Sequence, residues 1–464
     1  MESRYEVEAD RAQGTRSNTV YREAFNIMKV LRWSILLGSV ASFSALLPGT
    51  CSAQPGTPIL KFDFGSGPIK AGYTRIAPTS VYRDEIGYGY EPGAKVALGD
   101  HGETTTSELP FTFSAKVPEG NYDVMLTFGD SSTGTTFTVK AESGRLMLER
   151  LNVKAGEVVE RSFTTNVRTP KLAKLPANAT GREEVSLDQF DRANSRDWDD
   201  RLSLEIDSPH AALRTIEISP SPDARTVFLA GDSTVTDRDG GLDVSWGQIL
   251  PRFFKPGVAV SNQAQSGETL KSFANALRLD KILSQMKKGD YLFLQFGHND
   301  SKQNWPQTYV EPETTYKAYL KAYIAEAKLR GALPILVTPM DRADRATGAP
   351  AHGHGGYPDA MREVSQEEHV PLIDLYKMSV LLYDSAGENA PKLLADGTHS
   401  TAYGGYEFAK CIITGIRQDK LDLASSIVAD FKDFDPAHPD SETKLGVAHL
   451  FDGDGKRIAV KPGP

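Results

Sequence analysis

Short segments in which apolar and polar residues alternate recur between about residues 59 and 219. They are rich in β-branched and aromatic residues, and Gly, Asn, Asp and Ser separate them. The clearest are residues 60–64, 111–117, 122–128, 136–139, 202–206 and 215–218. A period of two is typical of strands with one buried face. Many short strands without a helical pattern indicate a β-sandwich, which we predict over residues 54–219.

The pattern changes to alternating strands and helices after residue 225. Near-continuous apolar runs lie at residues 226–230, 258–262, 291–296, 333–338 and 372–375. Such runs are expected of parallel strands that are buried on both faces. Helical patterns lie between them, for instance at residues 312–329 and 357–369. We therefore predict a doubly wound α/β domain over residues 226–425.

Two further segments complete the predicted organisation. The stretch Ser-Pro-Ser-Pro-Asp at residues 219–223 predicts a short linker between the two domains. A tail occupies residues 426–464, where apolar segments at 447–451 and 458–460 flank a Gly-Asp-Gly turn. This arrangement predicts a β-hairpin.

The first part of the chain has the pattern of a secretory signal peptide. Lys29 and Arg32 lead into an apolar run at residues 33–47, which ends near the small residues Cys-Ser-Ala. Fifteen residues are too few to span a bilayer, which takes about 20. We therefore predict a signal peptide region over residues 1–53, with the true start at Met28, and a secreted or periplasmic protein.

Composition narrows the classes of partner. The 464 residues carry 52 basic and 61 acidic side chains, a net charge of -9, in an ordinary globular composition. The acidic balance argues against nucleic acid and anionic membrane surfaces as partners. Of the two cysteines, Cys51 lies in the predicted signal region, so Cys411 has no partner for a disulfide and cysteine-based zinc sites are excluded. The oligomeric state stays open.

The residues that carry chemistry stand at the ends of predicted strands. Gly-Asp-Ser-Thr follows the first α/β strand at residues 231–234, and the second strand leads into a loop that ends at Gly267. The third strand ends in Gly-His-Asn-Asp at 297–300, and Asp-Gly-Thr-His at 396–399 precedes the last helix. Open parallel sheets bind ligands at the carboxyl ends of their strands. We expect these four segments to meet there.

Together these segments contain the parts of an acyl-transfer site. A serine is a weak nucleophile until a base activates it, and His399 could be that base for Ser233, with Asp396 holding the ring in one tautomer. The backbone N–H groups of Ser233 and Gly267 and the side chain of Asn299 could bind the oxyanion. No metal and no cofactor is needed.

The order of these segments resembles the SGNH (GDSL-type) hydrolases. Within that superfamily the runs at 231–235, 297–300 and 396–399 look like those of the rhamnogalacturonan acetylesterases, as do the segments at 357–362 and 370–375. The resemblance covers about 200 residues and implies a flavodoxin-like three-layer α/β/α fold. It also implies removal of acetyl groups from a pectic polysaccharide. One departure concerns the sugar preference: the family often has Arg-Ser after the glycine, whereas Glu268 and Thr269 stand here.

The N-terminal region resembles, more loosely, the galactose-binding-like or malectin-like modules that accompany such esterases. The matching runs are Phe-Asp-Phe-Gly at 62–65, Gly-Tyr-Gly-Tyr at 87–90 and Thr-Ile-Glu-Ile at 215–218. Tyr88, Tyr90 and Trp198 could stack on sugar rings, or could be core or edge aromatics. The acidic cluster of Asp197, Asp199 and Asp200 could bind calcium, although a solvated acidic loop is the favoured interpretation.

Two histidines near the strand ends are expected to border the site. His298 follows the third strand, and His354 lies with His352 in a Gly-rich loop after the fourth strand. We predict that His298 and His354 bind substrate. The pair of histidines in the loop could also bind a metal, but no further ligands are apparent.

The sequence thus predicts a secreted carbohydrate esterase that deacetylates a plant cell-wall polysaccharide, rhamnogalacturonan in the first place. An SGNH esterase for another acetylated glycan, such as xylan or peptidoglycan, is the alternative enzyme. A lipase would show an apolar lid, which we do not find in the sequence. A non-catalytic carbohydrate-binding protein is the alternative from another class.

Overall fold

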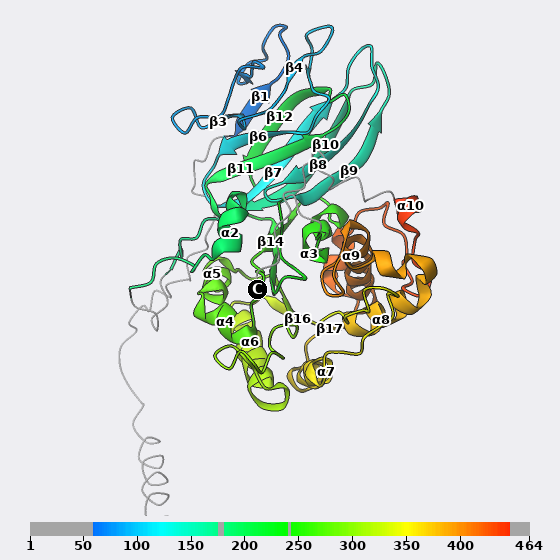
Figure 1. Cartoon of the computed structure of the whole chain (residues 1–464). Coiled ribbons are helices and arrows are strands. Elements are labelled where there is room, and N and C mark those ends of the chain that lie inside the picture. Colours follow the sequence, from blue (N-terminus) through cyan, green and yellow to red (C-terminus); the bar gives the residue numbers. More distant parts are fainter. Residues whose placement is uncertain (1–58, 175–180, 240–242, 446–464) are drawn as a thin grey trace, which may run out of the picture. The chain divides into compact units, whose positions relative to one another are not determined.

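The computed structural model describes residues 59–174, 181–239 and 243–445 (Figure 1). The predicted signal region 1–53, the start at Met28 and the tail hairpin at 447–460 lie outside these residues. Within the described ranges, no helix is both long and apolar enough to cross a membrane.

The N-terminal part, up to residue 220, consists of two sheets that are mostly antiparallel. The first contains β10 (Val159–Val167), β7 (Gly120–Phe128), β12 (Leu213–Pro220), β1 (Leu60–Asp63) and β2 (Thr74–Arg75) in that order, with β4 (Ala97–Leu98) and β5 (Thr105–Thr106) at the side of β12. The second has the order β3 (Tyr88–Tyr90), β6 (Phe111–Lys116), β11 (Arg201–Asp207), β8 (Thr135–Ala141) and β9 (Arg145–Val153). Each of the six segments with period-two alternation lies on one of these strands.

One cluster of buried side chains lies between the two sheets. Every second residue of β7 is buried, from Tyr122 to Phe128, and these side chains pack with Phe62 of the same sheet and Phe113 of the other. Side chains of a strand alternate between its faces, so the polar residues between them face away from this core.

The C-terminal part is built on a five-stranded parallel sheet. Its order is β14 (Val258–Asn262), β13 (Arg225–Gly231), β15 (Tyr291–Gln295), β16 (Leu333–Val337) and β17 (Leu372–Ile373). All five predicted runs form these strands, and β13, the first in the chain, lies inside the sheet. This order is that of a doubly wound α/β fold, so the predicted α/β architecture of this domain is confirmed.

Helices cover both faces of the parallel sheet (Figure 1). On one face lie α3 (Trp246–Ile249), α8 (Leu375–Ser385) and α9 (Ala402–Gln418), and on the other α4 (Leu270–Asn275), α5 (Arg278–Gln285), α6 (Lys317–Leu329) and α7 (Tyr357–Glu368). Successive residues of β13 serve different cores: Val227 and Leu229 pack under the first group, Phe228 and Ala230 under the second. The buried strands therefore have no polar face, as the continuous apolar runs predicted.

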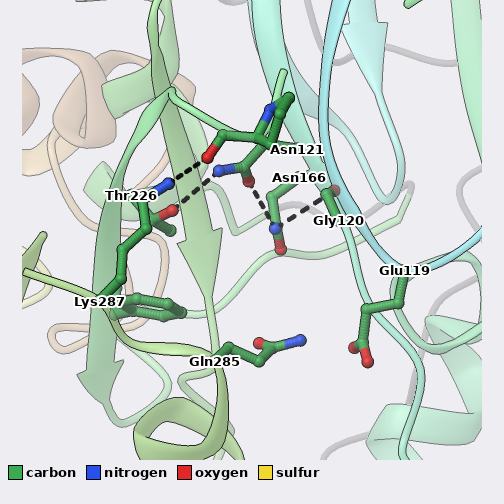
Figure 2. Close-up of a pocket in the computed structure, with 9 residues that line it drawn as sticks. Glu119, Gly120, Asn121, Asn166, Thr226, Gln285 and Lys287 are labelled. Carbon is green, nitrogen blue, oxygen red and sulfur yellow. Dashed lines mark hydrogen bonds between the residues drawn. The ribbon is translucent and has the colours of Figure 1, made fainter. Parts of the chain in front are cut away.

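The two parts adjoin at the amino-terminal end of β13. Strand β12 continues through Pro220, so the first two residues of the predicted linker at 219–223 belong to a strand, and residues 221–224 connect β12 to β13. At the junction Asn121 donates from Nδ2 to Thr226 Oγ1 at 2.9 Å, and Asn166 Nδ2 donates to Asn121 Oδ1 at 2.8 Å (Figure 2). A polar cavity of about 30 Å³ lies beside these residues, bounded by Gln285. It is close to one water molecule in size and lies at the end of β13 opposite Ser233.

Buried charges also pair between the two parts at the other end of β13, near the serine turn. Arg145 of β9, 1% exposed, binds Asp237 of the α/β part at 2.6 Å and Asp197 at 3.0 Å. In the reverse direction, Arg278 of α5 pairs with Asp191, which belongs to the N-terminal part. An unpaired charge at such depth would cost several kcal/mol, so these side chains hold the two parts in one arrangement.

Each carboxylate of the acidic cluster pairs with a basic side chain. Asp197 is 4% exposed and pairs with Arg145. Asp199 binds Arg201 at 2.8 Å, and Asp200, which is exposed, binds Lys116 at 3.1 Å. The interpretation as a solvated acidic loop is therefore wrong for Asp197, which is buried, and in the described part of the chain these side chains form no group suited to a metal ion.

The aromatic residues considered for sugar stacking are mostly core. Tyr90 is 1% exposed and Trp198 is 7% exposed. Tyr88 is half-buried against Phe62, with 5.1 Å between the ring centroids. Tyr90 and Trp198 have no free ring face for a sugar in this structure.

Candidate active site

The turn after β13 presents Ser233 at the edge of the sheet. Gly231 and Asp232 are buried, whereas Ser233 is half-buried. A side chain at Gly231 would lie 2.9 Å from the carbonyl oxygen of Gln295, so only glycine fits there. Asp232 fixes the turn, because its Oδ1 accepts from both the N–H and the hydroxyl of Thr234, at 2.9 and 2.8 Å.

His399 lies between Asp396 and Ser233. Its Nδ1 is 2.7 Å from Asp396 Oδ2, and its Nε2 is 2.9 Å from Ser233 Oγ. The other oxygen of Asp396 accepts the backbone N–H groups of Thr398 and His399, at 2.9 and 2.8 Å. Asp396 therefore determines both the position of the ring and, by accepting from Nδ1, the tautomer in which Nε2 is free to take a proton.

The charge of Asp396 is stabilised in this arrangement. Burial alone would raise the pKa of its carboxyl group, but the hydrogen bonds from His399 hold the pKa well below its usual range. The carboxylate thus stays ionised and remains an acceptor for the imidazole.

The loop that carries Asp396 and His399 is tightly constrained. The N–H of Ala395 donates to the carbonyl oxygen of His399 at 2.7 Å, which closes the loop on itself. Gly397 has a φ of +86°, and a side chain there would lie 2.7 Å from the carbonyl oxygen of Ala343. Thr401 then caps α9 by accepting from the N–H of Gly404.

The segments predicted to bind an oxyanion adjoin the serine turn. Gly267 has a φ of +82°, a left-handed conformation that favours glycine. Its loop is tied to the serine turn, because the N–H of Gln265 donates to the carbonyl oxygen of Gly231 at 3.2 Å. Asn299 contacts the same loop, since its Nδ2 donates to the carbonyl oxygen of Glu268 at 3.1 Å. The loops that carry Gly267 and Asn299 are thus connected to the turn that carries Ser233.

His298 and His354 lie below the site and not on its surface. They are 1% and 2% exposed, with their ring centroids 4.4 Å apart. His298 Nδ1 is 3.3 Å from Asp232 Oδ2, and burial, followed by the nearby charges of His298 and Arg342, lowers the pKa of His354 to about 2. The prediction that these histidines bind substrate is at odds with this burial: His298 faces Asp232 of the turn that holds Ser233, and His354 packs on the ring of His298.

Two basic residues without a motif also reach the site. Lys302 donates to Asn299 Oδ1 at 2.7 Å. Arg342, in the loop after β16, donates to the carbonyl oxygen of His298 at 3.2 Å and to Thr398 Oγ1. Sequence reasoning missed both; only the position of Lys302, three residues after Asn299, could have indicated one of them. No group of three or more His, Cys, Asp or Glu side chains suited to a metal ion occurs in the described ranges.

Comparison with known proteins assigns the α/β part. Residues 229–405 match the GDSL-like Lipase/Acylhydrolase family. The chain is 39% identical over 215 residues to the probable rhamnogalacturonan acetylesterase YesY of Bacillus subtilis (strain 168), a match that covers 45% of this chain and 99% of that protein. The chain belongs to the GDSL-like lipase/acylhydrolase family. The resemblance inferred from the motifs is therefore confirmed at the level of the family, and this GDSL hydrolase acts on carboxylic esters.

Two further relatives come from the same organism. The GDSL hydrolase is 34% identical over 223 residues to the rhamnogalacturonan acetylesterase RhgT, covering 44% of this chain and 94% of that protein. It is 27% identical over 384 residues to the uncharacterized esterase YxiM, covering 78% and 92%. The crystal structure of YxiM aligns with 79% of this chain and 99% of that chain, with 24% identity and a TM-score of 0.43.

Proposed function

We propose that the GDSL hydrolase removes acetyl groups from a polysaccharide, rhamnogalacturonan in the first place, through an acyl-enzyme formed on Ser233. The observation that carries this proposal is the position of His399, within hydrogen-bond distance of both Ser233 and Asp396. The names of YesY and RhgT support the choice of substrate. We also propose that residues 1–53 direct the protein out of the cytoplasm.

In the proposed mechanism Ser233 Oγ attacks the carbonyl carbon of the acetyl ester while His399 Nε2 takes its proton. Asp396 stabilises the resulting imidazolium ion. The tetrahedral intermediate collapses when His399 gives the proton to the departing sugar hydroxyl. Water then attacks the acetyl-enzyme with the same base, and acetate and free Ser233 are released.

The protein is expected to lower the activation barrier most by stabilising the negatively charged oxygen of the tetrahedral intermediate. The N–H groups of Ser233 and Gly267 and the Nδ2 group of Asn299 are the proposed donors. Donors that are fixed before the reaction stabilise this charge without reorganisation. The hydrogen bonds of Asn299 to Glu268 and Lys302 hold the amide in place in the free enzyme.

Asn299→Ala is expected to lower kcat by roughly 10²–10³ with little change in KM, because the amide acts chiefly in the transition state. The measurement is steady-state kinetics with p-nitrophenyl acetate. Asn299→Asp, which keeps the shape but replaces the donor by an acceptor, is the matched control and should be at least as slow. A pure KM effect would make Asn299 a substrate-binding residue instead.

The acid side of the pH–rate profile should report a single proton. Since the pKa of Asp396 lies well below its usual range, this carboxylate stays ionised as the pH falls and adds no proton to the profile. We expect log(kcat/KM) for p-nitrophenyl acetate to fall with a slope of one. A slope of two would mean that Asp396 is protonated in the same pH range, contrary to the geometry.

The substrate assignment is tested by acetate release from acetylated rhamnogalacturonan, acetylated xylan and acetylated peptidoglycan under identical conditions. Ser233→Ala serves as the blank for spontaneous hydrolysis. The proposal requires the highest kcat/KM on rhamnogalacturonan. Preference for xylan or peptidoglycan would select one of the alternative esterases, and no turnover of any ester would leave a carbohydrate-binding protein.

For the N-terminal part we propose a β-sandwich module of the galactose-binding-like type. Its two sheets around one core support this assignment. Because Tyr90 and Trp198 are buried, a sugar site on it would have to use other residues.

A further inference from the structure

Lys302 and Arg342 place two positive charges at the edge of the proposed oxyanion hole. Lys302 Nζ is 2.7 Å from the side chain of Asn299, and Arg342 donates to the carbonyl oxygen of the preceding residue at 3.2 Å. Arg342 also donates to Thr398, the neighbour of His399 in the chain. The two cations therefore lie beside the proposed oxyanion donor Asn299 and the loop that carries His399.

Neither cation has an acidic partner in the described part of the chain. Comparable side chains of this domain do: Arg238 pairs with Asp243, and Arg362 pairs with Asp374 at 3.0 Å. Lys302 and Arg342 are both partly exposed. Two neighbouring cations without an ion pair create a local attraction for anions.

The surroundings of Lys302 suit an anionic ligand. Burial, and after it the positive charge of Arg342, lower the pKa of Lys302, while the nearby carboxylate of Asp232 raises it by less. A carboxylate placed between the two cations would reverse the second of these effects. Hydrogen bonds between a cation and a carboxylate are among the strongest that a surface can offer a ligand.

An exposed indole lies next to this pair. Trp305 is 38% exposed, and Lys302 Nζ is 4.1 Å from the centroid of its ring. The loop is folded back on itself, because the N–H of Trp305 donates to the carbonyl oxygen of Lys302 at 2.9 Å. An aromatic face offers apolar area to the C–H groups of a sugar ring, while the adjacent cations offer partners to a charged substituent.

We propose that Lys302, Arg342 and Trp305 form a subsite for the carboxylate of a uronic acid residue of the acetylated polymer. The inference rests on the proposed function and narrows it. Rhamnogalacturonan carries a carboxylate on every second residue of its backbone, whereas the xylose backbone of xylan is neutral. The subsite thus supplies a physical reason for preferring a pectic polymer over a neutral one.

The test compares acetylated rhamnogalacturonan with the same polymer after its carboxyl groups have been reduced to alcohols. Lys302→Gln removes the charge but keeps an N–H donor for Asn299, and Lys302→Arg is the control that keeps the charge. We expect Lys302→Gln and Arg342→Gln each to lower kcat/KM about ten-fold more on the native polymer than on the reduced polymer, with the difference in KM. The loss on the reduced polymer measures any disturbance of Asn299 and of the His399 loop, and Lys302→Arg should lose no more on the native polymer than on the reduced one. Equal losses on both polymers would overturn the proposal, since they would arise from disturbed catalytic groups.

A second measurement separates the subsite from the proposed substrate. Unacetylated oligogalacturonate should inhibit hydrolysis of p-nitrophenyl acetate competitively, about ten-fold more weakly in each Gln variant and more weakly at high salt. A neutral galacto-oligosaccharide is the control. Inhibition without any turnover of rhamnogalacturonan would leave the subsite standing and refute the proposed substrate. Turnover of rhamnogalacturonan with no more inhibition by oligogalacturonate than by the neutral sugar would refute the subsite alone.

Discussion

Replacing Ser233 with alanine is expected to reduce acetate release by several orders of magnitude while the protein still folds. Ser233 is half-buried, and its hydroxyl contacts His399 at 2.9 Å, so alanine removes one oxygen without leaving a cavity in the core. The remaining site would keep its oxyanion donors but could form no acyl-enzyme. The measurement is the single-turnover and steady-state rate with p-nitrophenyl acetate, with thermal unfolding as the control for structure.

The other members of the proposed triad should follow the same pattern. Groups that act as one unit are not additive, so His399→Ala should cost about as much as Ser233→Ala, and the double variant little more. Asp396→Asn should cost up to about 10⁴-fold, as loss of an orienting acid does in a comparable triad. A Ser233→Ala variant with nearly the wild-type rate would contradict the whole assignment of the active site, because the reaction would then not need the hydroxyl of Ser233.

The strands and the segments of the candidate site could be predicted because their signals are local. Apolar runs buried on both faces identify parallel strands, Ser233 and Asn299 stand shortly after two of them, and His399 stands just before the last long helix. A glycine with a constrained conformation, such as Gly397, is also visible in the sequence as part of a motif.

What could not be predicted depends on side chains that meet from distant parts of the chain. His298 follows a strand end as Asn299 does, yet its ring turns inward because Asp232 offers it a buried partner. Asp197 looks like a solvated acidic residue until Arg145, 52 positions away, is seen beside it. The pattern of apolar and polar residues along the chain carries no information about such pairs. Arg342 was missed for the same reason, because its contacts, His298 and Thr398, are distant in the sequence.

The buried ion pairs between the two parts of the protein involve residues of the loops that form the candidate site. Asp237, the partner of Arg145, lies four residues after Ser233 and accepts at Oδ1 from Asn262 Nδ2 at 2.7 Å. Asn262 ends β14 and begins the loop that leads to Gly267. A side chain of the N-terminal sheets thus holds both the serine turn and the loop of the proposed oxyanion hole.

A second contact acts on the same loop from the other side. Arg278 donates to the carbonyl oxygen of Gln263 at 3.2 Å and pairs with Asp191 of the N-terminal part. Asp188, also from that part, accepts from Gln265 Nε2 at 3.4 Å. The N-terminal sheets are therefore expected to act as a scaffold for the catalytic loops, whatever they bind.

A fragment of residues 226–464 is accordingly expected to be insoluble or heat-labile, and poor even on p-nitrophenyl acetate. Truncation would leave Asp237 without its cation and would expose the surface that now faces β9 and β10. In the full chain, Arg145→Met should lower the free energy of unfolding by about 3–5 kcal/mol, since two buried carboxylates lose their partner. Thermal unfolding and the rate with p-nitrophenyl acetate measure the two effects, and Arg145→Lys should retain part of both.

The alternative is a tethered binding module that only concentrates the enzyme on its polymer. In that case the fragment would be soluble, would turn over p-nitrophenyl acetate at the wild-type rate and would lose activity on acetylated pectin alone, through a lower effective concentration. The two outcomes differ on the small ester, which is too small to reach the N-terminal sheets. The bonds from Arg145 to Asp237 and from Asp237 to Asn262 favour the scaffold, because a tether has no need to fix a catalytic loop.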